Sequence, residues 1–147
     1  MRLSGSCHCG NIAFRLNWSP EPASIPARAC TCTFCTRHGG VWTSCPGGTL
    51  RIRVRDRARV SDYAFGTGTA AFHVCAACGV VPVVTSRVDG RLHAVVNVNT
   101  FDDVDPALLR HASANLDGET EPDRLARRAR NWIADVAFED VASDNPD

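Results

Sequence analysis

The sequence predicts a mainly β protein of one domain that carries a single α-helix near its C-terminus. Two segments, 12–18 and 50–54, alternate apolar with polar residues, which is the period of a half-buried strand. Towards the end of the chain the apolar residues recur at helical spacing, which predicts a helix over about residues 121–139. A chain of 147 residues suits one domain with one core. We expect that domain to span residues 1–141 and the polar residues 142–147 to form a frayed tail.

Turn-forming residues divide the rest of the chain into short segments. Three prolines make residues 19–26 a connecting loop. Asp89-Gly90 is typical of a tight hairpin turn. Thr120 and Asp123 resemble a capping box at the start of the C-terminal helix. Further strands are expected at 60–65, 71–75, 80–86 and 92–98. The polar sides of the helix are expected to carry most of Arg124, Arg127, Arg128 and Arg130.

Composition and charge argue against several functions. The 16 basic and 16 acidic residues give a formal net charge of zero, which disfavours a nucleic-acid partner. The N-terminus lacks the apolar segment of a secretory signal, and no apolar run reaches the roughly 18 residues of a membrane span. The sequence has no coiled-coil seam, so it does not predict an oligomeric state. We therefore expect a cytoplasmic protein with no membrane partner, whose eight cysteines stay reduced and available to metal.

Four of the cysteines have the spacing of a closed zinc site. Cys75-Ala76-Ala77-Cys78-Gly79 has the form of a zinc knuckle, in which a tight turn points two sulfurs at one spot. Cys7-His8-Cys9-Gly10 offers the second pair that such a knuckle needs. Together the four thiolates can hold one structural Zn²⁺ in tetrahedral geometry. The alternative is that all four are buried thiols packed as small apolar side chains.

A second group, Cys30, Cys32 and Cys35, offers three thiolates within six residues. Three protein ligands leave one position for water or substrate, as in catalytic zinc sites. Zinc with three thiolates is a weak Lewis acid that readily accepts another thiolate, which favours a sulfur substrate. The sequence thus predicts a second, open zinc site. The alternative is a purely structural site that Cys45 or His38 closes.

These motifs resemble those of the glutathione-dependent formaldehyde-activating (GFA) family, which includes centromere protein V. The resemblance covers roughly residues 3–103 and rests on the segment 5–14, the two later cysteine motifs with Gly39 and Gly79, and the segment 95–102. It implies a zinc-bearing β-tent fold. It also implies a structural zinc on Cys7, Cys9, Cys75 and Cys78, and a catalytic zinc on Cys30, Cys32 and Cys35. The chain departs from the family pattern at Thr31 and Thr36.

The resemblance also implies the chemistry of a carbon–sulfur lyase. Its substrate would be an adduct of glutathione or another small thiol with formaldehyde or another aldehyde. In that scheme the sulfur is held as a thiolate, the form that attacks and leaves best. Arg37 would steer a carboxylate of the thiol and His38 would shuttle the proton, unless both are exposed loop residues. The alternatives are a non-catalytic zinc-binding module for a protein or nucleic-acid partner, and a redox or zinc sensor.

Overall fold

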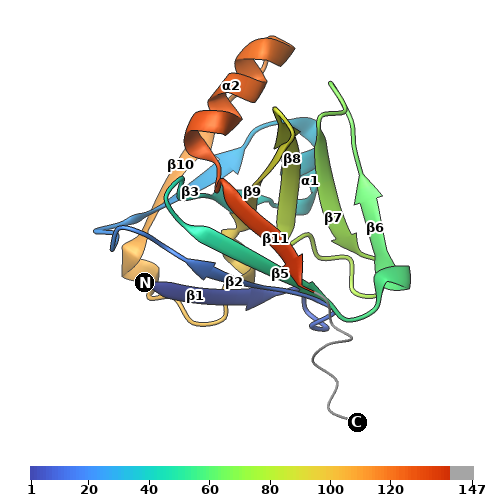
Figure 1. The fold of residues 1–147 in the computed structure, drawn as a ribbon, viewed down its shortest axis with the longest axis vertical. Helices are drawn as coiled ribbons and strands as arrows, with labels where there is room; N and C mark the ends of the chain where they lie inside the picture. The colour runs from blue at the N-terminus through green and yellow to red at the C-terminus, as the bar shows by residue number, and fades with distance from the viewer. Residues whose placement is uncertain (140–147) are drawn as a thin grey trace.

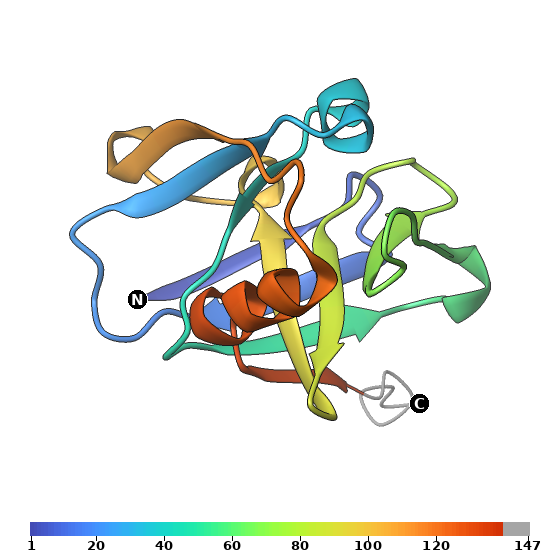
Figure 2. The ribbon, with the colours of Figure 1, turned by 90° about the horizontal axis from the view of Figure 1, so that it is seen from above.

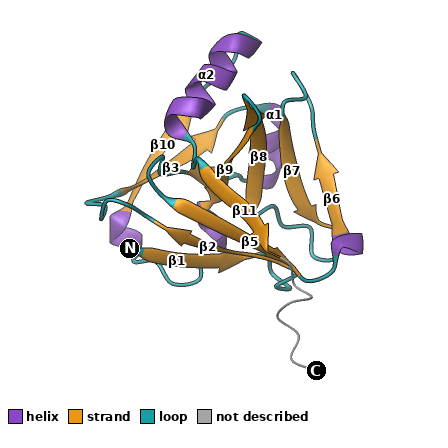
Figure 3. Cartoon of the chain, in the orientation of Figure 1, coloured by secondary structure: helices purple, strands orange, loops and turns teal. Residues whose placement is uncertain are grey.

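Two β-sheets share one core in the computed structural model, which describes residues 1–139 (Figure 1). Strands make up most of the regular structure, so the mainly β prediction is confirmed (Figure 3). The predicted tail, 142–147, and the last two residues of the predicted domain lie outside the described residues. Within residues 1–139, no helix is both long and apolar enough to cross a membrane.

The smaller sheet has four strands and the larger has seven. The smaller sheet, in spatial order, consists of β1 (Arg2–Ser6), β2 (Ile12–Asn17), β5 (Thr49–Val54) and β11 (Asp135–Glu139). The larger sheet consists of β10 (Leu109–Ala114), β3 (Ile25–Cys30), β4 (Val41–Thr43), β9 (Arg91–Asn97), β8 (Val83–Val88), β7 (Ala70–Cys75) and β6 (Val60–Tyr63). The α-helices are α1 (Thr33–His38) and α2 (Glu121–Asn131), and 3₁₀ turns occur at Arg57–Arg59, Val98–Thr100 and Pro106–Leu108.

The alternating pattern of the predicted strands places the core between the two sheets. Ile12 and Leu16 of β2 and Leu50 of β5 are fully buried, and β2 pairs antiparallel with β5 so that these residues share one face. Val83 and Val96 contribute from the larger sheet to the same cluster. Burying each such side chain stabilises the fold by about 1.5–3 kcal/mol. The core therefore fixes the relative placement of the two sheets.

The structure confirms the predicted hairpin turn but only part of the predicted proline-rich loop. Asp89 and Gly90 have φ of 52° and 78°, as a tight hairpin requires, and they join β8 to β9. The predicted loop 19–26 is wrong at its end, because Ile25 and Pro26 begin β3. Ile25 is fully buried. Proline is tolerated near the start of a strand, where its missing N–H breaks no central ladder.

The C-terminal helix is shorter than predicted. α2 begins at Glu121, where the Thr120 side chain accepts a hydrogen bond from the Asp123 N–H at 3.2 Å. It ends at Asn131 rather than at residue 139. Ile133 exchanges two backbone hydrogen bonds with Ala94, and residues 135–139 form β11, parallel to β5. The apolar residues after Trp132 fit a strand as well as a helix over so short a span, and pairing with existing strands decides between them.

α2 stands over one end of the larger sheet. It crosses β8 and β9 when seen from above (Figure 2), and Arg128 on its inner side donates hydrogen bonds to Thr69 and Ser86. Ile133, directly after the helix, is fully buried in the shared core. This anchor holds α2 in place above the sheet.

We expect Ile133→Ala to destabilise the protein by about 2–5 kcal/mol, because it opens a cavity where the helix is anchored. Urea unfolding followed by circular dichroism measures the change. Val136→Ala is the control, since Val136 is only half-buried, and its loss should be about 1 kcal/mol. Equal losses at the two positions would contradict the anchoring role of Ile133.

Candidate metal centre

The first cysteine group has the geometry of a zinc tetrahedron. The Sγ atoms of Cys7, Cys9, Cys75 and Cys78 all lie within 4.8 Å of one another. The Cys7 and Cys9 sulfurs are 3.8 Å apart, and the Cys9 and Cys75 sulfurs 3.5 Å apart. Zn–S bonds of about 2.3 Å at tetrahedral angles place sulfurs about 3.8 Å apart. The donor set and its spacing therefore fit Zn²⁺.

Two similar turns present these sulfurs. Cys7 N–H donates to the Ile12 carbonyl at 2.9 Å, and Cys75 N–H donates to the Val80 carbonyl at 3.0 Å. Gly10 and Gly79, with φ of 85° and 84°, give each turn a left-handed backbone conformation that residues with a side chain rarely adopt. One turn joins β1 to β2 in the smaller sheet, and the other follows β7 in the larger. The four-cysteine group therefore ties the two sheets together.

The electrostatics of this group also favour a cation. Burial raises the pKa of Cys7 to about 11. Burial acts in the same direction on Cys78, but backbone N–H groups and the neighbouring thiols outweigh it and lower the pKa of Cys78 to about 6. Thiols this close stabilise one thiolate by keeping others protonated. A divalent cation replaces those protons and lets all four ionise.

The second group is assembled where β3 runs into α1. Cys30 ends β3, Cys32 caps α1, and Cys35 lies buried within that helix. The Cys35 backbone N–H donates to the Cys32 sulfur at 3.3 Å. Trp42 of β4 donates its indole N–H to the Cys35 sulfur at 3.4 Å. The thiol of Cys35 lowers the pKa of Cys30 to about 5, and Cys30 together with burial raises the pKa of Cys35. As in the first group, one thiolate is stabilised while a neighbouring thiol keeps its proton.

Neither Cys45 nor His38 belongs to this group of three. Cys45 is buried in the core between the two sheets, where its thiol donates to the Ser19 carbonyl at 3.1 Å. The His38 ring packs against Phe34, with ring centroids 4.4 Å apart. Within residues 1–139, only Cys30, Cys32 and Cys35 are close enough together to act as ligands here. Their geometry fits a zinc ion with one position left open.

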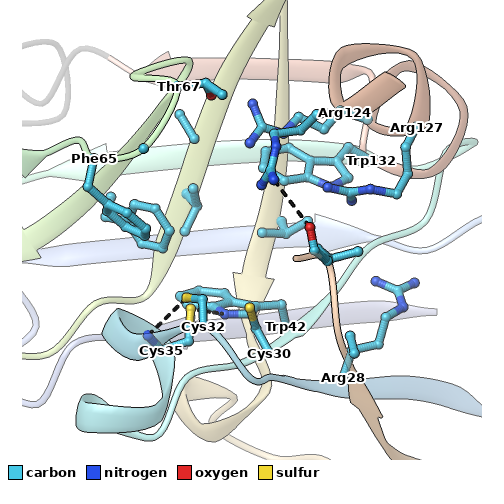
Figure 4. Close-up of a pocket in the computed structure, with 18 of the residues that line it drawn as sticks. Arg28, Cys30, Cys32, Cys35, Trp42, Phe65, Thr67, Arg124, Arg127 and Trp132 are labelled. Atoms are coloured by element: carbon cyan, nitrogen blue, oxygen red, sulfur yellow. Dashed lines mark hydrogen bonds between the residues drawn. The ribbon is translucent and has the colours of Figure 1, made fainter. Parts of the chain in front are cut away.

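A cavity of about 390 Å³ begins at these three sulfurs. Figure 4 shows Cys30, Cys32 and Cys35 at one end, and Arg124 and Arg127 of α2 at the other, with Trp132 directly after that helix. The aromatic walls are Trp42, Phe65, Phe72 and Trp132. The open side of the metal group therefore faces a space large enough for a small organic molecule.

Comparisons with known proteins agree with this arrangement. The family model described as glutathione-dependent formaldehyde-activating enzyme matches residues 2–115. The chain belongs to this family. A crystal structure of a Rhodobacter sphaeroides protein, determined by structural genomics, is similar to this GFA-family chain, with 32% identity and a TM-score of 0.55. The match covers 71% of this chain and 92% of that one. No curated protein matched the chain.

The structure brings all seven predicted cysteine ligands of this GFA-family chain into two groups, but it does not bring Arg37 and His38 to the cavity. Neither residue is among those that line it. The Arg37 side chain is exposed and donates to the Thr33 carbonyl on its own helix at 3.3 Å. The His38 ring makes an edge-on contact with Trp42, with ring centroids 6.1 Å apart. Their catalytic roles stay a prediction.

The cationic residues that do line the cavity were missed. They are Arg28, Arg124, Arg127 and Arg128. The helical pattern predicts the α2 arginines mostly on the polar sides of the helix, but Arg128 is buried. The signal was available, because Arg124 and Arg128 precede Trp132 by eight and four residues and so share its side of the helix.

Removal of one ligand from each group should separate a structural from an open zinc. We expect Cys75→Ser to lower the melting temperature by roughly 10 °C or more, because metal binding at that site contributes folding energy. Cys32→Ser should also remove one zinc but shift the melting temperature far less. Elemental analysis and differential scanning calorimetry measure both quantities. Cys45→Ser, which keeps the hydrogen-bond donor, is the control and should keep both zincs. Equal shifts for Cys75→Ser and Cys32→Ser would contradict the assignment.

Trp42→Phe tests the hydrogen bond to the open group. The change keeps an aromatic ring but removes the N–H donor to Cys35, so zinc affinity there should fall about tenfold. Competition with a zinc-binding dye measures the affinities of the two sites. The control is Trp132→Phe, a change to another wall of the cavity that should alter neither. An unchanged affinity in Trp42→Phe would show that the hydrogen bond does not tune this site.

Proposed function

We propose that this chain is a zinc-dependent enzyme of the carbon–sulfur lyase type that acts on a thiol–aldehyde adduct at Cys30, Cys32 and Cys35. The observation that carries the proposal is the open side of this group. Three sulfurs suited to zinc face a cavity, and no fourth ligand atom in residues 1–139 lies among them. Membership of the GFA family supports the same reading.

The proposed reaction is the reversible cleavage of RS–CH(OH)R′ into RSH and O=CHR′. The carbon–sulfur bond breaks while the hydroxyl oxygen forms the carbonyl, the sulfur keeps the bonding electron pair, and the hydroxyl proton passes to the sulfur or to solvent. Zinc, when bound, supplies a Lewis-acid position that favours the substrate sulfur as thiolate. The reaction consumes no oxidant or reductant.

The residues of the chain contribute position and environment. The Trp42 N–H bonds to the Cys35 sulfur and helps to hold this thiolate in place. Phe72 and Trp132 wall the cavity and exclude water from the adduct. Arg124 and Arg128 supply positive charge at the end of the cavity away from the sulfurs. There they would steer a carboxylate of the thiol, the role that the sequence suggested for Arg37. His38 stays the proposed proton carrier, although it contacts Trp42 and does not line the cavity itself.

The proposal extends to substrate class and location. Glutathione or another small thiol, joined to formaldehyde or another aldehyde, is the substrate that the family description suggests. All eight cysteines are free thiols, which fits the reducing conditions of the cytoplasm. The alternative, a non-catalytic module for a protein or nucleic-acid partner, requires a second zinc that is closed and indifferent to thiols.

Zinc-edge X-ray absorption with and without a small thiol tests the proposal. We expect two zincs per chain, one of which gains a sulfur ligand when glutathione is added. Exchange spectroscopy by NMR should show faster interconversion of glutathione and its formaldehyde adduct. Cys32→Ser should abolish both effects, and Cys45→Ser should retain them. Two closed zincs and an unchanged exchange rate would favour the non-catalytic module.

A further inference from the structure

A buried arginine without a carboxylate partner lies at the far end of the cavity. Arg128 is 6% exposed, and its Nη1 donates to the Thr69 and Ser86 hydroxyls at 2.8 and 3.0 Å. Its guanidinium lies 5.0 Å from the centroid of the Trp132 ring. Its Nε is buried with no hydrogen-bond partner among the described residues. Hydroxyls and a ring solvate this cation but do not neutralise it, and a buried charge is costly unless it is paired.

The neighbouring carboxylates are too few to balance the charge. Glu119 accepts two hydrogen bonds from Arg127, at 2.9 and 3.2 Å, and lies 3.7 Å from the Nε of Arg124. That Nε is also buried without a hydrogen-bond partner in residues 1–139. Asp117 is the one acidic residue among those that line the cavity. Arg124, Arg127 and Arg128 at this end, together with Arg28 on the β3 side of the cavity (Figure 4), have only Asp117 and the already engaged Glu119 to balance them, so the cavity has an excess of positive charge.

The environment makes that charge effective. Most of the other side chains that line the cavity are apolar, among them Trp42, Phe72, Val84 and Val95. Few polar groups screen a charge in such surroundings, so an ion pair formed there is stronger than one in water. Burial and then the neighbouring cations Arg127 and Arg124 lower the pKa of Arg128 to about 10. It therefore stays protonated at pH 7, and a bound anion would relieve the repulsion.

We propose that the substrate thiol carries an oxyanion at the end away from its sulfur, and that Arg28, Arg124 and Arg128 bind it while the sulfur sits at Cys30, Cys32 and Cys35. This inference rests on the proposed function and names its substrate class: an anionic thiol with an apolar stem. The family match ends at residue 115, so α2, which supplies Arg124 and Arg128, lies beyond the matched residues. The subsite therefore combines Arg28, inside the matched segment, with two arginines outside it.

Matched thiols that differ only in their far end test this inference. Mercaptohexanoate and mercaptohexyl phosphate carry the two common oxyanions, and mercaptohexanol is their uncharged counterpart. Quenching of tryptophan fluorescence gives the dissociation constants for the zinc-loaded full chain, since Trp42 and Trp132 both line the cavity. We expect the better oxyanion to bind about 10–100-fold tighter than the alcohol. The ratio of the two oxyanions shows whether carboxylate or phosphate is preferred.

Charge-removing variants locate the subsite. Arg124→Gln and Arg28→Gln, alone and combined, should reduce the preference for the oxyanion to roughly threefold or less and leave mercaptohexanol binding unchanged. These positions are only partly buried, so their variants avoid the packing loss of Arg128. Arg130→Gln is the control, because Arg130 is exposed on the same helix and does not line the cavity. Equal binding of charged and uncharged thiols, or a preference that survives the double variant, would overturn the inference.

Hexanoate, which has no thiol, separates this inference from the proposed function. Hexanoate binding that weakens in Arg124→Gln supports the oxyanion subsite even if no thiol adds a sulfur to zinc, in which case the lyase proposal alone fails. Addition of a zinc sulfur ligand by all three thiols, with equal affinities, would keep the open zinc and reject the oxyanion subsite.

Discussion

Cys9 and Cys75 are 66 residues apart in the sequence, and their sulfurs are 3.5 Å apart in the structure. Closing a loop of that length costs conformational entropy, which metal binding and core packing have to offset. Both are present at the same place, because Cys7 and Cys75 are fully buried members of the shared core. This contact fixes the corner where the two sheets meet. The rest of the larger sheet, including β3 and β4 with the open group, is positioned from that corner.

Both cysteine groups offer sulfur atoms as ligands, but their surroundings differ. In the closed group every sulfur faces another sulfur, and backbone N–H groups of Ile12 and Cys78 complete the surroundings. In the open group α1 and Trp42 cover one side only. The other side faces the cavity. The two groups therefore differ in how many cysteines they supply and in how far they are enclosed, but not in ligand type.

Local patterns in the sequence predicted those features that depend on neighbouring residues. The strands around Ile12 and Leu50, the hairpin at Asp89-Gly90 and both cysteine groups are of this kind. Pairings between distant segments could not be read in this way, and β11 is an example, because it becomes a strand only by lying parallel to β5. Its few apolar residues fitted a continued helix equally well.

The site was predicted unevenly for a geometric reason. The spacing of cysteines predicts which of them can share a metal. Proximity in sequence does not predict whether a basic side chain points towards the same site. Arg37 follows Cys35 by two residues, which is roughly 200° around a helix, so it faces away from the sulfurs. The cavity arginines come instead from β3 and from a helix that begins 91 residues after β3 ends. Only the folded arrangement reveals that they meet.

All seven candidate metal ligands occur before residue 79, whereas the helix over the far end of the cavity begins at Glu121. The later segment is held to the body by backbone pairing at Ile133, by β11 and by the hydrogen bonds of Arg128, and none of these contacts involves a sulfur ligand. Side chains of α2 that line the cavity can therefore change without altering the cysteine groups. A lineage built on this plan could acquire new ligands by substituting the cavity-facing residues of one helix while it keeps every cysteine.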